Sequence, residues 1–149
     1  MRAVLQRVKT ASVKVEGDVV GAISRGWLVF VAVTRDDQLK DCDYIVEKTC
    51  KLRLFPDDSG KFNLSVEDIQ GEILVVSQFT LMADCRKGRR PSFSDSAPQD
   101  RAKEIYDHIV RLFKKTPLAI ATGQFQANMQ IDLTNDGPVT IILDSSKQL

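Results

Sequence analysis

Three polar side chains follow directly on an aliphatic run near the middle of the chain. Ile73 to Val76 are all apolar, and the next residues, SQFTL at 77 to 81, bring the hydroxyls of Ser77 and Thr80 and the amide of Gln78. Groups of this kind can hydrogen-bond a substrate, and a buried one left unpaired costs about 1 to 3 kcal/mol. They therefore satisfy neighbouring strands or meet a ligand, and the pattern leaves both interpretations open.

A cluster of cations comes a few residues later. The segment from Cys85 to Pro91 places four basic side chains in five positions, at Arg86, Lys87, Arg89 and Arg90. Guanidinium groups are suited to bidentate contacts with phosphate. The net charge of the chain is only +1, so an anionic partner would have to be held by this local patch. The alternative is an ordinary solvated loop.

A third segment, Asn135 to Thr140, reads NDGPVT. Asn, Asp, Gly and Pro are the usual residues of turns, and a small fraction of X-Pro bonds in folded proteins are cis. On its own this segment indicates a turn between two strands.

Several chemistries are not expected from this sequence. The single histidine, His108, falls on the polar face of a predicted helix, so no imidazole is expected as a general base. No HExxH, Cys-x-x-Cys, GxGxxG or Walker pattern is present. We therefore expect no metal site and no cofactor. Three cysteines without paired spacing favour a reducing cytosol, and the longest apolar run, Trp27 to Val33, is too short for a membrane span.

The elements that would position these residues follow from the periodicity of apolar residues. Alternation over the first 33 residues predicts a meander of strands, and Glu72 to Met82 is predicted as a central strand. Two helices are expected, one capped by Asp36 or Asp37 and one that starts at Ser96-Ala97-Pro98. Further strands are predicted at 118 to 122, 129 to 133 and 139 to 143. Each helix has one apolar face that is expected to pack on the core. On the first helix this apolar stripe is Leu39, Cys42, Val46 and Cys50, and on the second it is Ala102, Ile105, Tyr106, Ile109, Leu112 and Phe113.

Strands outnumber helices and come in runs, which indicates an α+β fold. We expect one domain over residues 1 to 149, because no linker or repeat interrupts the chain. Its sheet should be mostly antiparallel with barrel-like curvature, and two main helices should pack on it.

Taken together, these segments resemble the D-aminoacyl-tRNA deacylases of the type that carries a Gly-cisPro motif. The likeness runs from end to end, and SQFTL and GPVT match the two signature motifs of that family. Gln126 and Asn128 stand where the family pattern has Gly and Asp. The other matching stretches are MRAVLQRVKTASVKVEG, LRLFPDDSGKFNLSV, KGRRPSFS and TGQFQANM.

The resemblance implies a cytosolic, homodimeric hydrolase that cleaves the ester between a D-amino acid, or glycine, and the terminal ribose of tRNA, and that spares L-aminoacyl-tRNA. Its partner would be the 3′ end of aminoacyl-tRNA. The implied catalytic segment is Ser77, Gln78, Phe79 and Thr80. An aminoacyl ester next to a ribose hydroxyl is already activated, so hydrogen-bond donors could suffice. Attack by water aided by the 2′-hydroxyl and covalent catalysis by Thr80 both remain open.

The resemblance also implies roles for other residues. Gly137 and Pro138 of one subunit would reach into the pocket of the other and occupy the space that an L side chain needs. Substrate-binding positions would include Phe125, Met129 and Ala102, although each could equally be core. The basic side chains of Arg86, Lys87, Arg89 and Arg90 would contact the tRNA.

Two other classes of function remain possible at this point. A non-catalytic RNA-binding module would explain the basic loop, but aromatic residues make up only 7% of the chain and no RRM, KH or OB signature is present. A serine or threonine esterase for small molecules would explain SQFTL but would leave the basic loop and the Gly-Pro pair without a role.

Overall fold

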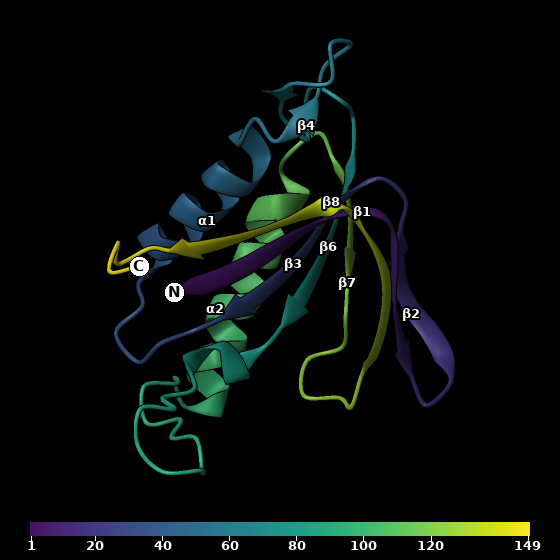
Figure 1. The fold of residues 1–149 in the computed structure, drawn as a ribbon. Coiled ribbons are helices and arrows are strands. Elements are labelled where there is room, and N and C mark those ends of the chain that lie inside the picture. Colours follow the sequence, from purple (N-terminus) through teal and green to yellow (C-terminus); the bar gives the residue numbers. More distant parts are fainter.

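The computed structural model describes residues 1–149 and has a curved, six-stranded sheet with two helices on one face (Figure 1). The first three strands, β1 (Arg2–Val15), β2 (Asp18–Ile23) and β3 (Gly26–Ala32), are present as predicted and pair antiparallel. The predicted meander is wrong, because β2 and β3 pair with different parts of β1 and not with each other. The sheet continues through β6 (Glu72–Ser77) and β7 (Ala119–Thr122), while β8 (Gln130–Asp144) pairs antiparallel with β1.

Two of the strand pairings are parallel, which makes the sheet mixed. β6 runs parallel to β3 on one side and to β7 on the other. A helix precedes each of β6 and β7 in the chain, and a parallel neighbour requires such a crossover. The expected α+β class is therefore confirmed, with antiparallel pairing around β1 and a parallel centre.

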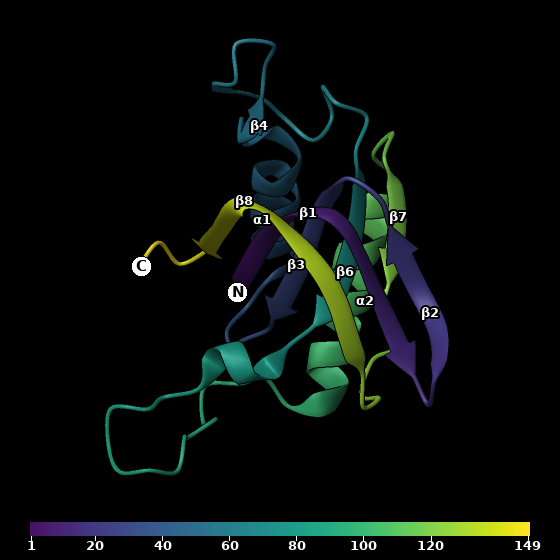
Figure 2. The same ribbon diagram turned by 45° about the vertical axis from the view of Figure 1, so that its right-hand side comes forward.

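The sheet bends until it nearly closes into a barrel (Figure 2). β1 and β8 are long and pair along most of their length, with irregularities in register that allow strong curvature. At the other edge β2 approaches β7 so closely that a Cβ on Gly21 would lie 2.4 Å from the carbonyl oxygen of Thr122. Glycine is needed there, and the predicted barrel-like curvature is confirmed.

The helices α1 (Leu39–Lys51) and α2 (Gln99–Lys114) lie where the sequence predicts them. Pro98 stands at the N-cap of α2, as expected. The cap of α1 is Gln38 and neither aspartate, because Asp37 accepts hydrogen bonds from the Met1 ammonium and from the Thr34 N–H. The prediction of Leu39 in the buried stripe is also wrong, since it is 48% exposed. Neither helix has the length and apolar character needed to cross a membrane.

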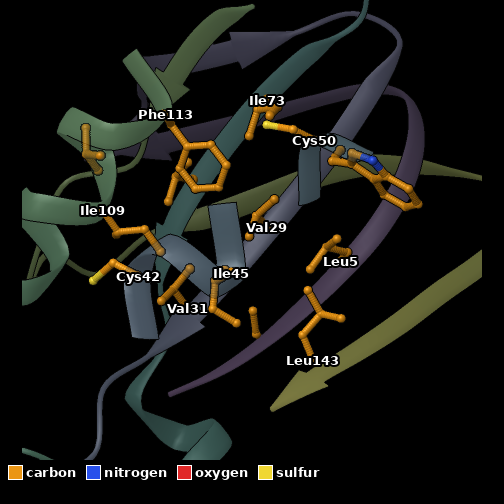
Figure 3. Packing of buried hydrophobic residues seen from close by; sticks show 14 of the residues in the cluster. Leu5, Val29, Val31, Cys42, Ile45, Cys50, Ile73, Ile109, Phe113 and Leu143 are labelled. Atoms are coloured by element: carbon orange, nitrogen blue, oxygen red, sulfur yellow. The ribbon is translucent and has the colours of Figure 1, made fainter. Parts of the chain in front are cut away.

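The main hydrophobic core fills the space between the sheet and the two helices (Figure 3). Ile45 and Cys42 from α1, Ile109 and Phe113 from α2, and Val29 on the central strand β3 belong to one buried cluster. A smaller cluster lies inside the curve of the sheet, on its other face, and consists of Val8, Ala11, Val13, Ile23, Leu28, Leu74 and Val76. Both cysteines of α1 are plain core residues, as the sequence predicts.

Two predicted boundaries are wrong, and one short strand pair was not predicted. The strand predicted over 72 to 82 ends at Ser77, and Phe79–Met82 form a 3₁₀ helix, η1. The strands predicted at 129 to 133 and 139 to 143 are one continuous strand, β8, so that NDGP is no turn between strands. A short pair, β4 (Phe55–Pro56) and β5 (Phe62–Leu64), projects beyond the end of α1 (Figure 1).

Candidate active site

A cavity of about 610 Å³ opens at the carboxyl end of β6, next to the start of α2. This volume is in the range of small-molecule sites. Ten of its sixteen lining residues are hydrophobic and none carries a charge. The lining residues are Ala32, Val33, Val76, Ser77, Gln78, Phe79, Ser96, Ala97, Gln99, Ala102, Phe125, Gln126, Ala127, Asn128, Met129 and Ile131.

The SQFT segment forms one wall of this cavity because the chain leaves the sheet there. Ser77 is the last residue of β6, and the Gln78 N–H still donates to the Val31 carbonyl at 2.8 Å. The chain then turns into η1, where the Leu81 N–H donates to the Gln78 carbonyl at 3.2 Å. The strand predicted over Glu72 to Met82 is therefore wrong for residues 78 to 82.

This turn decides which groups can donate hydrogen bonds to a ligand. The Gln78 N–H is already used by β3, whereas the N–H groups of Phe79 and Thr80 begin a helical turn, where they have no partner within the helix. The Gln78 side-chain amide donates to the Thr80 hydroxyl oxygen, which leaves the hydroxyl proton free to be donated. Thr80 does not itself line the cavity, but this bond holds it against Gln78, which does.

No side chain that lines the cavity can remove a proton from water or from Thr80. The cavity holds no carboxylate, amine or imidazole, and His108 lies on α2 outside the lining. The groups present can position a ligand and donate hydrogen bonds to it, but they cannot act as a general base.

Ala102, Phe125 and Met129 line the same cavity, so the structure brings these three predicted residues together. Phe125 packs on Tyr106, with ring centroids 5.6 Å apart. The Tyr106 hydroxyl donates to the Val75 carbonyl at 3.0 Å, and burial raises the pKa of Tyr106 far above its ordinary value. Tyr106 therefore supports the wall as a neutral phenol.

Six polar or small lining residues were not predicted from the sequence. Ser96, Ala97 and Gln99 come from the start of α2, where the sequence indicates only a helix cap. Gln126, Ala127 and Asn128 come from the turn between β7 and β8. For the residues of this turn, the sequence contains one indication of a role in the site: Gln126 and Asn128 stand where the family pattern has Gly and Asp.

The basic loop begins next to the cavity and is partly neutralised. Phe93, at its end, packs edge-on against Phe79 with ring centroids 5.1 Å apart. Arg86 is held by Asp84, with Nε–Oδ1 and Nη2–Oδ2 distances of 2.8 and 2.7 Å, and this contact holds the pKa of Asp84 well below its usual range. The remaining cations, Lys87, Arg89 and Arg90, are exposed and make no ion pair.

Gly137 and Pro138 form an exposed bulge in β8 and do not line the cavity of their own chain. The peptide bond between them is cis. Gln6 pairs with Thr140 and Val8 with Asn135, so three extra residues loop out of β8 at this point. The Asn135 side chain closes the bulge with two bonds to the backbone of Val139, at 2.9 and 3.1 Å.

Arg7 anchors the bulge from the neighbouring strand. Its side chain is almost completely buried, and its Nε donates to the Asp136 carbonyl at 2.9 Å. A second nitrogen donates to the Leu54 carbonyl, and the guanidinium lies over the rings of Phe55 and Phe62. A Cβ on Gly137 would lie 2.7 Å from the Val139 side chain and 3.2 Å from Arg7. The bulge is thus presented to solvent in one fixed position.

Comparison with known proteins agrees with this arrangement. A family model described as D-Tyr-tRNA(Tyr) deacylase matches residues 4–144. The D-aminoacyl-tRNA deacylases of Thermotoga petrophila and Clostridium botulinum (strain Alaska E43) are 56% and 52% identical over 147 residues, with 99% of each chain covered. A solved structure described as c-Myc DNA Unwinding Element Binding Protein is 43% identical, with a TM-score of 0.92 over 97% of this chain and 98% of its own.

Proposed function

Because the chain belongs to the D-aminoacyl-tRNA deacylase family, we propose that it hydrolyses the ester bond of D-aminoacyl-tRNA in the cavity beside Ser77 to Thr80. The protein is a hydrolase of this family, and its products are the free D-amino acid and tRNA. The observation that carries the proposal is the uncharged cavity at the SQFT segment, with free cations on the adjoining loop. Such a site can take the neutral end of a molecule whose remainder is a polyanion.

The chemical step uses hydrogen-bond donors in place of a general base. The N–H groups of Phe79 and Thr80 and the Thr80 hydroxyl stabilise the oxyanion that forms when water attacks the ester carbonyl. One donor of this kind is worth about 3 kcal/mol of barrier. Attack by water aided by the substrate's 2′-hydroxyl is favoured over covalent catalysis by Thr80, because Thr80 accepts a hydrogen bond from Gln78, does not line the cavity, and no basic side chain lines it.

A second copy of the chain completes each site. Gly137 and Pro138 are exposed, are held in place by Arg7 and Asn135, and lie outside the cavity of their own chain. In a two-fold dimer the bulge of each subunit enters the cavity of its partner, which creates two identical composite sites. The rigid carbonyls of the bulge then lie at the substrate's α-carbon and exclude an L side chain, while a D side chain points out of the pocket. Glycine, which has no Cβ, is also accepted.

The loop cations hold the acceptor end of the tRNA. Lys87, Arg89 and Arg90 contact phosphates, while Arg86 is paired with Asp84 and braces the loop. The reaction takes place in the cytosol, where aminoacyl-tRNA is used and where three free cysteines stay reduced.

Mixed dimers test both the activity and the shared site. Ala102→Phe fills the cavity but leaves the bulge intact, and Gly137→Ala distorts the bulge but leaves the cavity open. Each homodimer should be inactive on D-tyrosyl-tRNA. After the two variants are denatured and refolded together at equal concentration, half of the dimers contain one of each, so activity should return to about a quarter of the wild-type level.

The outcomes separate the two parts of the proposal. A mixture as inactive as its parents, alongside an active wild type, would contradict the shared site. A wild type that does not accelerate release of D-tyrosine from tRNA would contradict the activity itself.

A further inference from the structure

One exposed aromatic ring lies against the residue that anchors the bulge. Phe62 is 57% exposed, belongs to neither buried cluster and pairs with no other ring. The guanidinium of Arg7 lies over it, with Cζ 5.3 Å from the ring centroid. A large apolar side chain this exposed adds little to the core, so its contact with Arg7 is the feature to be explained.

The strand pair β4 and β5 holds the Phe62 ring in place. Phe62 begins β5 and pairs with Pro56 of β4, and the carboxylate of Asp57 closes the connecting turn by accepting two backbone N–H bonds, at 2.9 and 3.1 Å. Leu64, two residues further along, packs against the main core. Side chains two apart on a strand lie on the same face, so the packing of Leu64 directs Phe62 toward Arg7.

Arg7 connects this ring to the bulge. Arg7 is 5% exposed and donates to two carbonyls, that of Leu54 just before β4 and that of Asp136 just before Gly137. Such bonds are stronger where water is excluded. Because the Phe62 ring is exposed and contacts the guanidinium, it attracts the cation and also keeps water away from it.

We infer that Phe62 is a positioning residue for the reaction: its ring holds and shields the Arg7 guanidinium, and so fixes the bulge that selects the D enantiomer. This inference rests on the proposed function, since it adds a residue to the support of the shared site. Phe62 does not line the cavity, and it acts through Arg7.

Three variants separate support of the bulge from a general effect on the fold. Phe62→Ala removes the ring, whereas Phe62→Tyr keeps it. Val19→Ala is the matched control, because Val19 is also an exposed apolar residue, 58% exposed, on a strand that pairs with residues 11 to 15 of β1 and not with Arg7.

Hydrogen exchange followed by NMR measures the bulge without any substrate. The Val139 N–H donates to the Asn135 side chain within the bulge at 2.9 Å, so its exchange rate reports how often the bulge opens. Loss of the contact between ring and cation should raise this rate about two- to thirtyfold in Phe62→Ala. Phe62→Tyr and Val19→Ala should exchange at the wild-type rate.

Binding of two non-hydrolysable analogues measures the consequence at the site. Adenosine that carries D-tyrosine or L-tyrosine through a 3′-amide is titrated into wild type and each variant by isothermal titration calorimetry. An open bulge no longer excludes the L side chain, so the preference of Phe62→Ala for the D analogue should fall by the same two- to thirtyfold factor, about the rise in the open population. Phe62→Tyr and Val19→Ala should keep the wild-type preference.

The control variants and the two measurements make the inference refutable. It is overturned if Phe62→Ala exchanges at the wild-type rate, or if it binds the L analogue no better, relative to the D analogue, than wild type does. Equal changes in Val19→Ala, or the loss of wild-type values in Phe62→Tyr, would overturn it as well.

The proposed function fails separately, because the exchange measurement needs no ligand. Wild type that deacylates D-tyrosyl-tRNA and prefers the D analogue, beside a Phe62→Ala variant that does the same to an equal degree, overturns only the role of Phe62. Wild type that neither deacylates D-tyrosyl-tRNA nor distinguishes the analogues overturns the proposed function, and the role of Phe62 in selection with it.

Discussion

Replacement of Arg7 by alanine should destabilise the protein far more than loss of a comparable cation on the same strand. Arg7 is 5% exposed and donates to the carbonyls of Asp136 and Leu54. A buried carbonyl left without its donor costs about 1 to 3 kcal/mol, so the loss of two gives about 2 to 6 kcal/mol. We expect a value near the middle of this range, about 4 kcal/mol, because the space left over Phe55 and Phe62 adds to the loss while water entering beside Asp136 reduces it.

Lys14 provides the matched control. It also lies on β1 and also pairs with an aspartate on β8, but at 3.4 Å and with side chains 40% and 71% exposed. Such a surface pair contributes about 0 to 1 kcal/mol. Asp136→Asn serves as a second control, because Arg7 binds the Asp136 carbonyl more closely than its carboxylate, at 2.9 against 3.7 Å.

Urea unfolding followed by circular dichroism measures all three variants. Arg7→Ala should lower the free energy of unfolding by about 4 kcal/mol, and Lys14→Ala and Asp136→Asn by less than about 1 kcal/mol each. Deacylation by Arg7→Ala, measured where it is still folded, should also fall by more than about tenfold, because the bulge loses its anchor. An Arg7→Ala variant within about 1 kcal/mol of Lys14→Ala would refute the reasoning.

Four further predictions concern the loop, the bulge and the cysteines. Arg89→Ala combined with Arg90→Ala should weaken tRNA binding and reduce the slope of log affinity against log salt by about 2, whereas Arg86→Ala, whose charge is paired with Asp84, should change the slope less; filter binding over a salt series measures both. Gly137→Ala should abolish deacylation while the far-ultraviolet circular dichroism stays native, since a Cβ there meets Val139 at 2.7 Å on an exposed bulge; full activity would contradict the fixed position of the bulge. Burial raises the pKa of Cys42 and Cys50 to about 12, so iodoacetamide at pH 8 should modify only Cys85 in the native protein and all three cysteines in urea. Because the unfolded chain loses these thiol protons near pH 9 and the folded chain keeps them, the free energy of unfolding should fall as pH rises from about 9 to 12; a flat profile would contradict the burial of both thiols.

The periodicity of apolar residues was enough to predict the helices and most strands. The stripe that includes Ile105, Ile109 and Phe113 is buried against the sheet, and the alternation along β1 gives the two faces of a curved strand. Periodicity does not report which strands pair. The parallel neighbours of β6 depend on where α1 and α2 lead the chain, which is a property of the packed molecule.

The failures of prediction lie at the site, where local patterns are ambiguous. The apolar run into SQFTL continues to Leu81 and Met82 and therefore indicates a longer strand, but the chain turns after Ser77. NDGP has the composition of a turn, yet β8 continues through it because Arg7 and Asn135 bind the looped backbone. A hydrogen bond from a strand 129 residues away in the sequence leaves no local signal.

The cavity residues Ser96, Gln99 and Gln126 were missed for a similar reason. Each is a small or polar residue in a turn or at a helix start, where such residues are common without any function. Only the meeting of α2, β6 and the turn after β7 gives them a shared role.

The most direct test of the account compares D-tyrosyl-tRNA, L-tyrosyl-tRNA and glycyl-tRNA as substrates of one preparation of the wild-type protein. The rate of amino-acid release should exceed spontaneous hydrolysis for the D-tyrosyl and glycyl esters and should equal it for the L-tyrosyl ester. A fixed backbone excludes an L side chain by steric clash, so the L-tyrosyl ester should not be cleaved. A pocket that bound the side chain would distinguish two substrates by only about 1 to 3 kcal/mol per methylene. Comparable rates on the D- and L-tyrosyl esters would contradict the central claim.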